Sequence, residues 1–257
     1  IGTVNTIRNT KFETTFTGEV GLRGNYSTIF NYAMEVSPVD ESNLNQSLII
    51  VTPNTIDYGG ITEMWTDGSA IAFCPLSEDS YPYDARGIIQ HEAGGHGFGK
   101  LGDEYIYHNT FIDFCDCTCC EHVFEFNIAK SLGWYENLSL TGKMHEVPWS
   151  HLIFDDRYSD VVDIYEGGFK HARGVFRSEQ NSCMNNNISY YNAISREAIV
   201  KRIMEYAGES YSFEKFVEND KRDAVNSLSR SAERPGVTVR GNQYAPRIHK
   251  GKPDILK

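Results

Sequence analysis

The sequence has few basic residues and no long hydrophobic segment. Its 24 Lys and Arg face 35 Asp and Glu, which gives a formal net charge of −11. A chain with this balance provides no general positive field for a polyanion. No run of apolar residues is long enough to span a bilayer. We therefore expect neither a nucleic-acid partner nor a transmembrane segment.

The first residues lack an initiator Met, and they lack the charged, apolar and small-residue pattern of a signal peptide. We expect that a processed precursor or a shortened chain lies behind the start at Ile1. This start is also compatible with an export signal that was removed from a precursor.

No internal repeat or low-complexity segment interrupts the 257 residues, of which 40% are hydrophobic. A chain of this size and composition can bury a substantial core. We assign residues 1–220 to one folded domain and residues 221–257 to a C-terminal extension. The extension holds nine basic and three acidic residues and is interrupted by Pro and Gly. It is predicted to be irregular and to pack against the acidic domain.

Two short apolar runs, Ser47–Thr52 and Ser69–Pro75, have the composition of buried or edge strands in one sheet, with residues 57–60 as a turn between them. Asp84 is a suitable N-cap for a helix over residues 85–98, with Ile88 and Ile89 on its buried side. Four internal glycines weaken that helix by about 1 kcal/mol each relative to alanine. Its position in the fold must therefore stabilise it.

Helices are predicted again in the second half of the chain. Residues 125–132 precede a glycine stop at Gly133, and residues 192–207 repeat apolar side chains, including Ile203 and Tyr206, before Gly208. With strands early and helices late, the chain is predicted to have an α+β fold with a mixed sheet.

The segment from His91 to His96 has the composition of a zinc site. Two neutral imidazoles on one helix face can bind Zn²⁺, and Glu92 after the first of them can act as general base. The two histidines, however, are five residues apart, which separates them by roughly 140° on an ideal α-helix. A π-type turn absorbs one extra residue. We therefore predict a wide turn, with at least one i→i+5 hydrogen bond, accommodated by Gly94 or Gly95.

The third ligand is expected just after this helix, where glycines allow the chain to reverse. Asp103 is the preferred ligand, and Glu104 is the alternative. Glu104 can instead orient a histidine from outside the ligand set. Taken alone, a His-Glu pair with a displaced His is also compatible with ordinary, partly buried residues on a weak helix.

The longer segment HEAGGHGFGKLGDEY, residues 91–105, resembles the active-site signature of the bacterial IgA-peptidase family of zinc metallopeptidases. Segments 165–168 (YEGG), 174–177 (GVFR) and 181–185 (NSCMN) are similar to downstream blocks of that family, in the same order. The resemblance covers about residues 31–207. The extra residue between the two histidines departs from the usual His-Glu-x-x-His pattern.

The resemblance implies a metzincin-like fold with an active-site helix and a Met-containing turn. It implies that His91, His96 and Asp103 bind one zinc ion, that Glu92 is the base, and that Met184 lies in the turn beneath the metal. It also implies that an N-terminal part of the catalytic sheet precedes Ile1. By the same comparison, Tyr190 or Tyr191 is a candidate to stabilise the oxyanion or to contact substrate.

Several residues near these motifs have two interpretations. Residues 70–72 can form an edge strand that aligns substrate by β-augmentation, or a fully paired interior strand. Arg177 and Glu166 can brace a turn as a pair or line a substrate groove. His171, beside Lys170, is predicted to be a surface residue.

Four of the six cysteines fall in Cys115–Cys120, with His108 and His122 on either side. Disulfide bonds are the first interpretation, because such a cluster suits an exported protein. Free thiols come second and a separate structural metal third, because two spaced Cys-x-x-Cys pairs are missing.

Together these observations predict a zinc endopeptidase that is secreted or bound to a bacterial cell surface and acts on proteins or peptides. The family name suggests immunoglobulins among other extracellular proteins as substrates. Two alternatives remain: a catalytically silent binding module that contains a metal, and a zinc hydrolase of a non-peptide amide.

Overall fold

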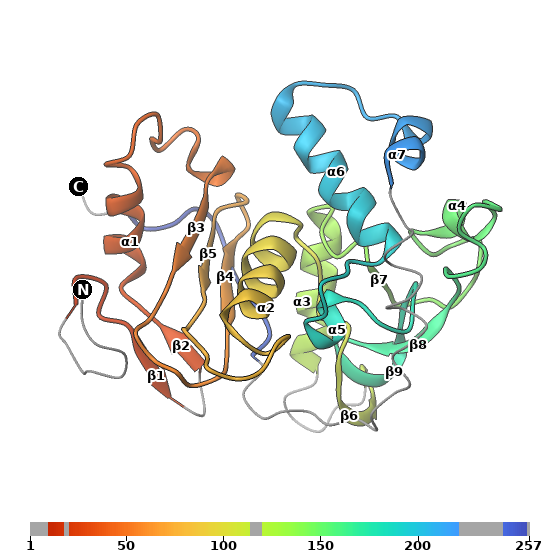
Figure 1. The fold of residues 1–257 in the computed structure, drawn as a ribbon, viewed down its shortest axis with the longest axis horizontal. Coiled ribbons are helices and arrows are strands. Elements are labelled where there is room, and N and C mark those ends of the chain that lie inside the picture. Colours follow the sequence, from red (N-terminus) through yellow and green to blue (C-terminus); the bar gives the residue numbers. More distant parts are fainter. Residues whose placement is uncertain (1–9, 18–20, 114–119, 221–243, 256–257) are drawn as a thin grey trace. The chain divides into compact units, whose positions relative to one another are not determined.

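The computed structural model describes residues 10–17, 21–113, 120–220 and 244–255 (Figure 1). These residues form mixed sheets and seven α-helices, in agreement with the predicted α+β class. The chain divides into two compact units, Ile1–Phe98 with Arg240–Lys257, and Gly99–Val239. One functional domain can comprise both units, so the domain proposed for residues 1–220 stays a prediction. Within the described part of the chain, no helix has the length and hydrophobicity needed to cross a membrane.

The first unit is built on a four-stranded mixed sheet with the order β10-β4-β5-β3. Its strands are β3 (Leu48–Val51), β4 (Ile61–Trp65), β5 (Ala70–Phe73) and β10 (Arg247–His249). The unit also contains the hairpin β1 (Thr15–Thr17) and β2 (Gly21–Arg23), helix α1 (Tyr26–Ala33) and the 3-10 turn η1 (Leu44–Gln46). Phe30, Ile71 and Phe73 are fully buried in its core.

The two predicted strands both form and pair in parallel as β3 and β5. Between them the chain contains a further strand, β4, which the sequence analysis missed, and residues 57–60 are irregular rather than a turn. Because β4 and β3 flank β5 on both sides, residues 70–72 lie in an interior strand. The edge-strand interpretation of these residues is therefore wrong.

The end of the C-terminal segment adds strand β10 to this sheet, parallel to β4. The prediction of irregular structure is thus wrong for residues 247–249, while residues 221–243 lie outside the described part. Polar contacts accompany the pairing, because Glu63 on β4 is fully buried and residues of β10 lie against its carboxylate. Its carboxylate accepts hydrogen bonds from Arg247 at 2.5 Å and Tyr26 at 2.8 Å, and lies 2.7 Å from His249 Nε2.

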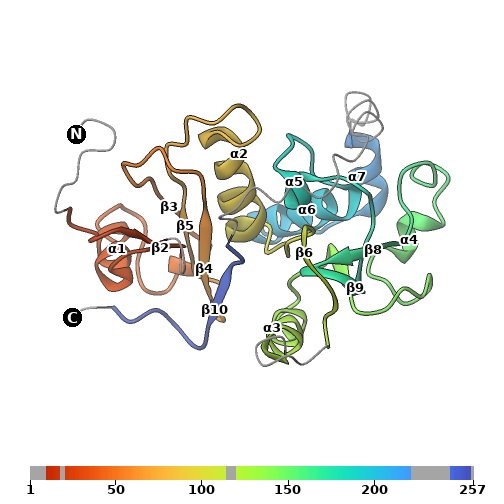
Figure 2. The same ribbon diagram turned by 90° about the horizontal axis from the view of Figure 1, so that it is seen from below.

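The predicted helix over residues 85–98 forms in two parts, α2 (Ala85–Ile89) and the π-helix η2 (Gln90–Phe98). Asp84 is its N-cap, as predicted, and accepts hydrogen bonds from the backbone of Arg86 and Gly87. Ile88 is buried, but Ile89 is 39% exposed, so the expected burial of both is wrong. The π-helix packs against β3, β4 and β5 (Figure 2). This packing supplies the stability that the glycine-rich sequence lacks.

The second unit contains a sheet in which β9 (Lys170–Arg177) pairs with β6 (Ile106–Phe111), β7 (Leu138–Ser139) and β8 (Tyr165–Gly168). Its helices are α3 (Cys120–Ser131), α4 (Ser150–Ile153), α5 (Cys183–Asn186), α6 (Ala193–Ala207) and α7 (Phe213–Asn219). One core cluster of this unit is centred on Trp149 and Tyr158.

Both late helices were predicted, with differences at their surfaces and ends. Helix α3 begins at Cys120 rather than residue 125, and Gly133 follows it with φ +71°. Helix α6 starts after its N-cap Asn192 and ends at Gly208, which has φ +68°. Ile203 is 47% exposed and Tyr206 is 40% exposed, so the apolar repeat is not buried along the whole helix.

Candidate metal centre

The π-helix brings the side chains of His91 and His96 together. Their Nε2 atoms lie 3.1 Å apart and their ring centroids 4.8 Å apart. A helix with i→i+5 bonding places residues five apart on the same face, which an α-helix does not do. The predicted wide turn is therefore confirmed, although it extends over nine residues rather than one turn.

Gly97 of this π-helix lies close to a side chain of the sheet. A Cβ there would lie 2.9 Å from Leu48 Cδ1 on β3, so an alanine would require the end of the Leu48 side chain to move.

Asp103 completes a group with the two histidines. One potential ligand atom from each of His91, His96 and Asp103 lies within 4.8 Å of the others, and all three residues are buried. The hydroxyl of Tyr105 donates to Asp103 Oδ2 at 2.9 Å, which fixes that carboxylate.

The donor set of this group fits a metal ion. Two nitrogen ligands of a tetrahedral zinc ion, each at about 2.0–2.1 Å from the metal, lie about 3.3 Å from one another. The separation of 3.1 Å between the two Nε2 atoms is close to this value. Two imidazoles and one carboxylate are also a common ligand set for zinc. The buried His91, His96 and Asp103 group can therefore bind a metal ion.

Glu92 is buried beside this group and is held by the neighbouring strand. Thr62 Oγ1, on β4, lies 2.8 Å from Glu92 Oε2 and 2.9 Å from the Glu92 carbonyl oxygen. On the other side, Gly60 leaves space for the carboxylate, because a Cβ there would lie 2.8 Å from Glu92 Oε1. The sequence analysis missed both residues. Only recognition of β4 and of its position against the helix would have identified them.

Glu104, the alternative third ligand, has a different environment. Its buried carboxylate accepts hydrogen bonds from Ser182, Asn137 and Asn192 at 2.5, 2.8 and 2.7 Å. Burial raises the pKa of Glu104, against the opposing effect of these donors. Its backbone N–H donates to the Met184 carbonyl at 2.8 Å. Glu104 thus joins the segment after the π-helix to the segment around Met184.

Met184 is fully buried in α5, and the two tyrosines that follow it use their hydroxyls inside the second unit. The Tyr190 hydroxyl donates to Glu179 Oε2 at 2.5 Å, and Tyr191 is hydrogen-bonded to the side chain of Cys183. Burial raises the pKa of Tyr191. Burial also raises the pKa of Glu179, to about 7.

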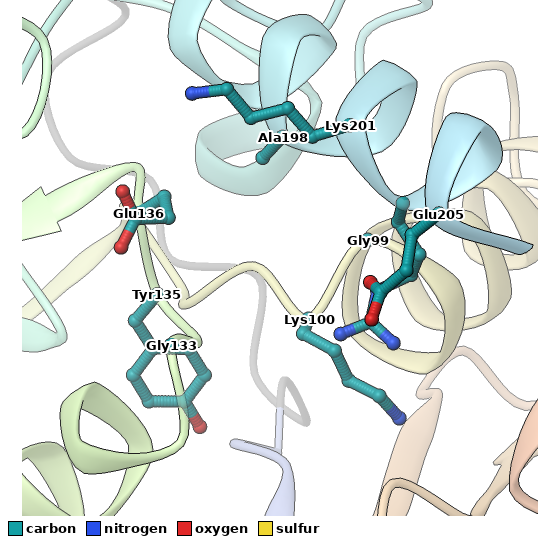
Figure 3. Close-up of a pocket in the computed structure, with 9 residues that line it drawn as sticks. Gly99, Lys100, Gly133, Tyr135, Glu136, Ala198, Lys201 and Glu205 are labelled. Carbon is teal, nitrogen blue, oxygen red and sulfur yellow. The ribbon is translucent and has the colours of Figure 1, made fainter. Parts of the chain in front are cut away.

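The chain reverses between the π-helix and Asp103 with a left-handed residue that the sequence analysis did not predict. Lys100 has φ +51°, and its carbonyl accepts a hydrogen bond from Tyr135, which itself has φ +57°. A Cβ at Gly102 would lie 2.6 Å from Leu138 Cδ1. A small polar cavity of about 220 Å³ lies between this segment, Tyr135 and α6 (Figure 3).

Arg177 braces the end of β8 through backbone atoms, since its Nη1 donates to the carbonyls of Glu166 and Gly167 at 3.2 and 2.5 Å. The Glu166 carboxylate instead accepts from the backbone of Gly174 at 3.0 Å. The expected position of His171 on the surface is wrong, because this residue is fully buried.

The cysteine cluster lies largely outside the described residues, so the disulfide interpretation of Cys115–Cys120 stays a prediction. Elsewhere, Cys74 and Cys183 are buried. Burial raises the pKa of the Cys74 thiol, and the nearby charge of Glu92 adds to this effect.

Comparison of the chain with models of known protein families and with curated proteins finds no match. The resemblance of residues 91–105 to the IgA-peptidase signature therefore rests on the residues themselves.

Proposed function

We propose that this chain is a zinc-dependent endopeptidase that hydrolyses peptide bonds of proteins or peptides. The observation that carries the proposal is the buried group of His91, His96 and Asp103, with Glu92 on the same π-helix as the two histidines. A metal ion with a purely structural role would not need the Glu92 carboxylate, which lies outside the ligand set.

His91 and His96 would hold the zinc ion through neutral imidazole nitrogens, and Asp103 through a carboxylate oxygen. When bound, the ion supplies Lewis-acid activation of a water molecule and of the scissile carbonyl, so no protein nucleophile is needed. Tyr105 keeps the Asp103 carboxylate in place by its hydrogen bond of 2.9 Å. Three protein ligands leave one position for water or substrate, which is the arrangement of catalytic zinc sites.

Glu92 acts as the general base in this proposal. It removes a proton from the attacking water and then delivers that proton to the nitrogen of the leaving amine. The Thr62 hydroxyl, 2.8 Å from Oε2, orients the carboxylate, while Oε1 lies against the space left by Gly60. Tyr190 or Tyr191 remains the candidate to stabilise the oxyanion or to contact substrate, although the Tyr190 hydroxyl now donates to Glu179 and Tyr191 is hydrogen-bonded to Cys183.

We further propose a metzincin-like architecture, in which Met184 forms the turn below the metal. Its support is the hydrogen bond from Glu104, next to Asp103, to the Met184 carbonyl. A flexible thioether can fill irregular space there without competing with the imidazoles for the metal. Extracellular proteins, including immunoglobulins, are the proposed substrates, and secretion or a bacterial cell surface is the proposed location.

Cleavage of a denatured protein mixture, with and without a chelator, tests the proposal. Glu92→Gln should retain the zinc ion at the His91, His96 and Asp103 site and lose roughly 10²-fold or more of the rate, because the base is removed. His91→Ala should lose the metal itself. Glu41→Gln, at an exposed position, is the matched control and should be unchanged.

The same assay separates the alternatives. A silent binding module would bind zinc and cleave nothing, and a hydrolase of another amide would cleave small amides but no protein. Wild-type turnover in Glu92→Gln would remove the assignment of the base.

A further inference from the structure

A second group of histidines lies in the second unit, on three different elements. His171 is on β9, His108 on the paired strand β6, and His122 on the first turn of α3. The ring centroid of His171 lies 5.2 Å from that of His122 and 5.6 Å from that of His108. This histidine cluster, His108, His122 and His171, has no role in the proposed hydrolysis.

The closest pair in the cluster lies at hydrogen-bond distance, which is also close to the spacing of two ligands on one ion. His122 Nδ1 and His171 Nε2 lie 2.9 Å apart. Two nitrogens on a tetrahedral metal lie about 3.3 Å apart, so the two ring nitrogens would have to separate by only about 0.4 Å to bind one metal ion. The other ring nitrogen of His171, Nδ1, lies 3.2 Å from the Thr110 hydroxyl, which can accept its N–H. In that tautomer Nε2 accepts a hydrogen bond from His122 Nδ1–H, and a metal ion bound by both nitrogens would replace this proton.

The surroundings of His122 and His171 favour the neutral imidazole, which metal ligation requires. Burial, with the nearby His122, His108 and Lys170, lowers the pKa of His171 to about 4. Burial and the charge of Lys170 also lower the pKa of His122. At neutral pH protons therefore compete weakly for these two nitrogens.

The donors also select the kind of ion. Imidazole nitrogen suits zinc, copper and nickel, whereas Mg²⁺ and Ca²⁺ require oxygen ligands. His108 is exposed, His122 is partly buried and His171 is buried. In this cluster only His122 and His171 have nitrogens close enough to bind one ion, and His108 must rotate to become the third ligand.

We propose that His122 and His171, with His108 as the mobile third ligand, bind a divalent transition-metal ion that links β6, β9 and α3. This site is separate from His91, His96 and Asp103, and it does not depend on the proposed peptidase activity. Because Lys170 opposes additional positive charge, its affinity is lower than that of the three-ligand centre.

Equilibrium dialysis of the full chain against Zn²⁺ tests the proposal, on tag-free protein whose reactive thiols have been alkylated so that cysteine cannot contribute. Wild type should bind two ions per chain, His91→Ala one, His122→Gln one, and the double variant none. His145→Gln is the matched control and should bind two, because His145 is an exposed histidine that stacks on Phe154. Mg²⁺ should leave the second site empty in every variant.

Thermal unfolding provides a second readout that requires no enzyme activity. Zn²⁺ should raise the Tm of His91→Ala, since a ligand that binds only the folded state stabilises it, and should not raise that of the double variant. If His122→Gln folds poorly, the exposed His108→Gln should weaken uptake of the second ion. Uptake of only one ion by wild type, or of two ions by His122→Gln, would overturn the proposed site while leaving the catalytic proposal intact.

Discussion

Replacing Gly60 with alanine should displace the general base without touching a metal ligand. The added Cβ would lie 2.5 Å from Glu92 Cγ and 2.9 Å from Ile88 Cγ2. Carbon atoms in contact prefer about 3.5–4.0 Å, so the Glu92 side chain must retreat by about 1 Å. Misplacement of a catalytic group by 1 Å can cost roughly 10²-fold in rate. We therefore expect Gly60→Ala to lose about that factor in kcat/KM.

The assay combines protein cleavage with measurement of bound zinc and of unfolding. Zinc content should remain at one ion per chain at low zinc concentration, because His91, His96 and Asp103 are unchanged. Overpacking should cost about 1–3 kcal/mol of stability. Gly24→Ala is the control for crowding in the same unit away from Glu92, since its Cβ would lie 3.1 Å from the Phe12 carbonyl oxygen and 3.2 Å from Ile29 and Phe73. Wild-type turnover in Gly60→Ala would refute the reasoning, as would equal losses of activity in the two variants.

Two further predictions concern buried hydrogen bonds. Thr62→Val keeps the shape of the side chain and removes the hydroxyl 2.8 Å from Glu92. The metal should stay bound while turnover falls about tenfold, which corresponds to the loss of one hydrogen bond of about 1.4 kcal/mol. Steady-state kinetics and metal analysis measure both, and unchanged turnover would contradict the prediction. Burial raises the pKa of Glu179 from 4.5 to about 7, so the folded state binds more protons than the unfolded state between these values. The free energy of unfolding should therefore fall by about 3 kcal/mol as pH rises from 4.5 to 7. Urea titrations between pH 4.5 and 7 should show that this decrease in the free energy of unfolding is absent in Glu179→Gln. An equal decrease in wild type and variant would contradict the assignment.

Features encoded by neighbouring residues could be predicted from the sequence. Asp84 could be identified as an N-cap because its side chain bonds to backbone only two and three residues away. Gly208 could be identified as a helix stop because the left-handed conformation, φ +68° here, favours glycine. The π-helix followed from one geometric condition, that residues 91 and 96 share a face.

Features that depend on distant contacts could not be predicted in the same way. Strand β4 is buried along its whole length and contains Glu63, whose carboxylate lies at hydrogen-bond distance from residues 184 and 186 positions later in the chain. A sequence window around residue 63 contains neither partner, so it shows a charged residue in a short apolar run. The burial of His171 also depends on a distant segment. Beside Lys170 this residue looks like a surface residue in the sequence, but the pairing of β9 with β6 places it in the interior.

The position of Glu92 shows why the candidate catalytic residues of a site are easier to predict from sequence than the residues that hold them in position. A general base must be a carboxylate or a similar group, so its type and its place beside two histidines restrict it strongly. The residues that orient it must only fit: one hydroxyl at 2.8 Å and one missing Cβ are sufficient, and Thr62 and Gly60 supply them from about 30 residues away. Many threonines and glycines in the sequence could have met those conditions. Only the pairing of β4 with β5, and the packing of the π-helix on that sheet, selects these two.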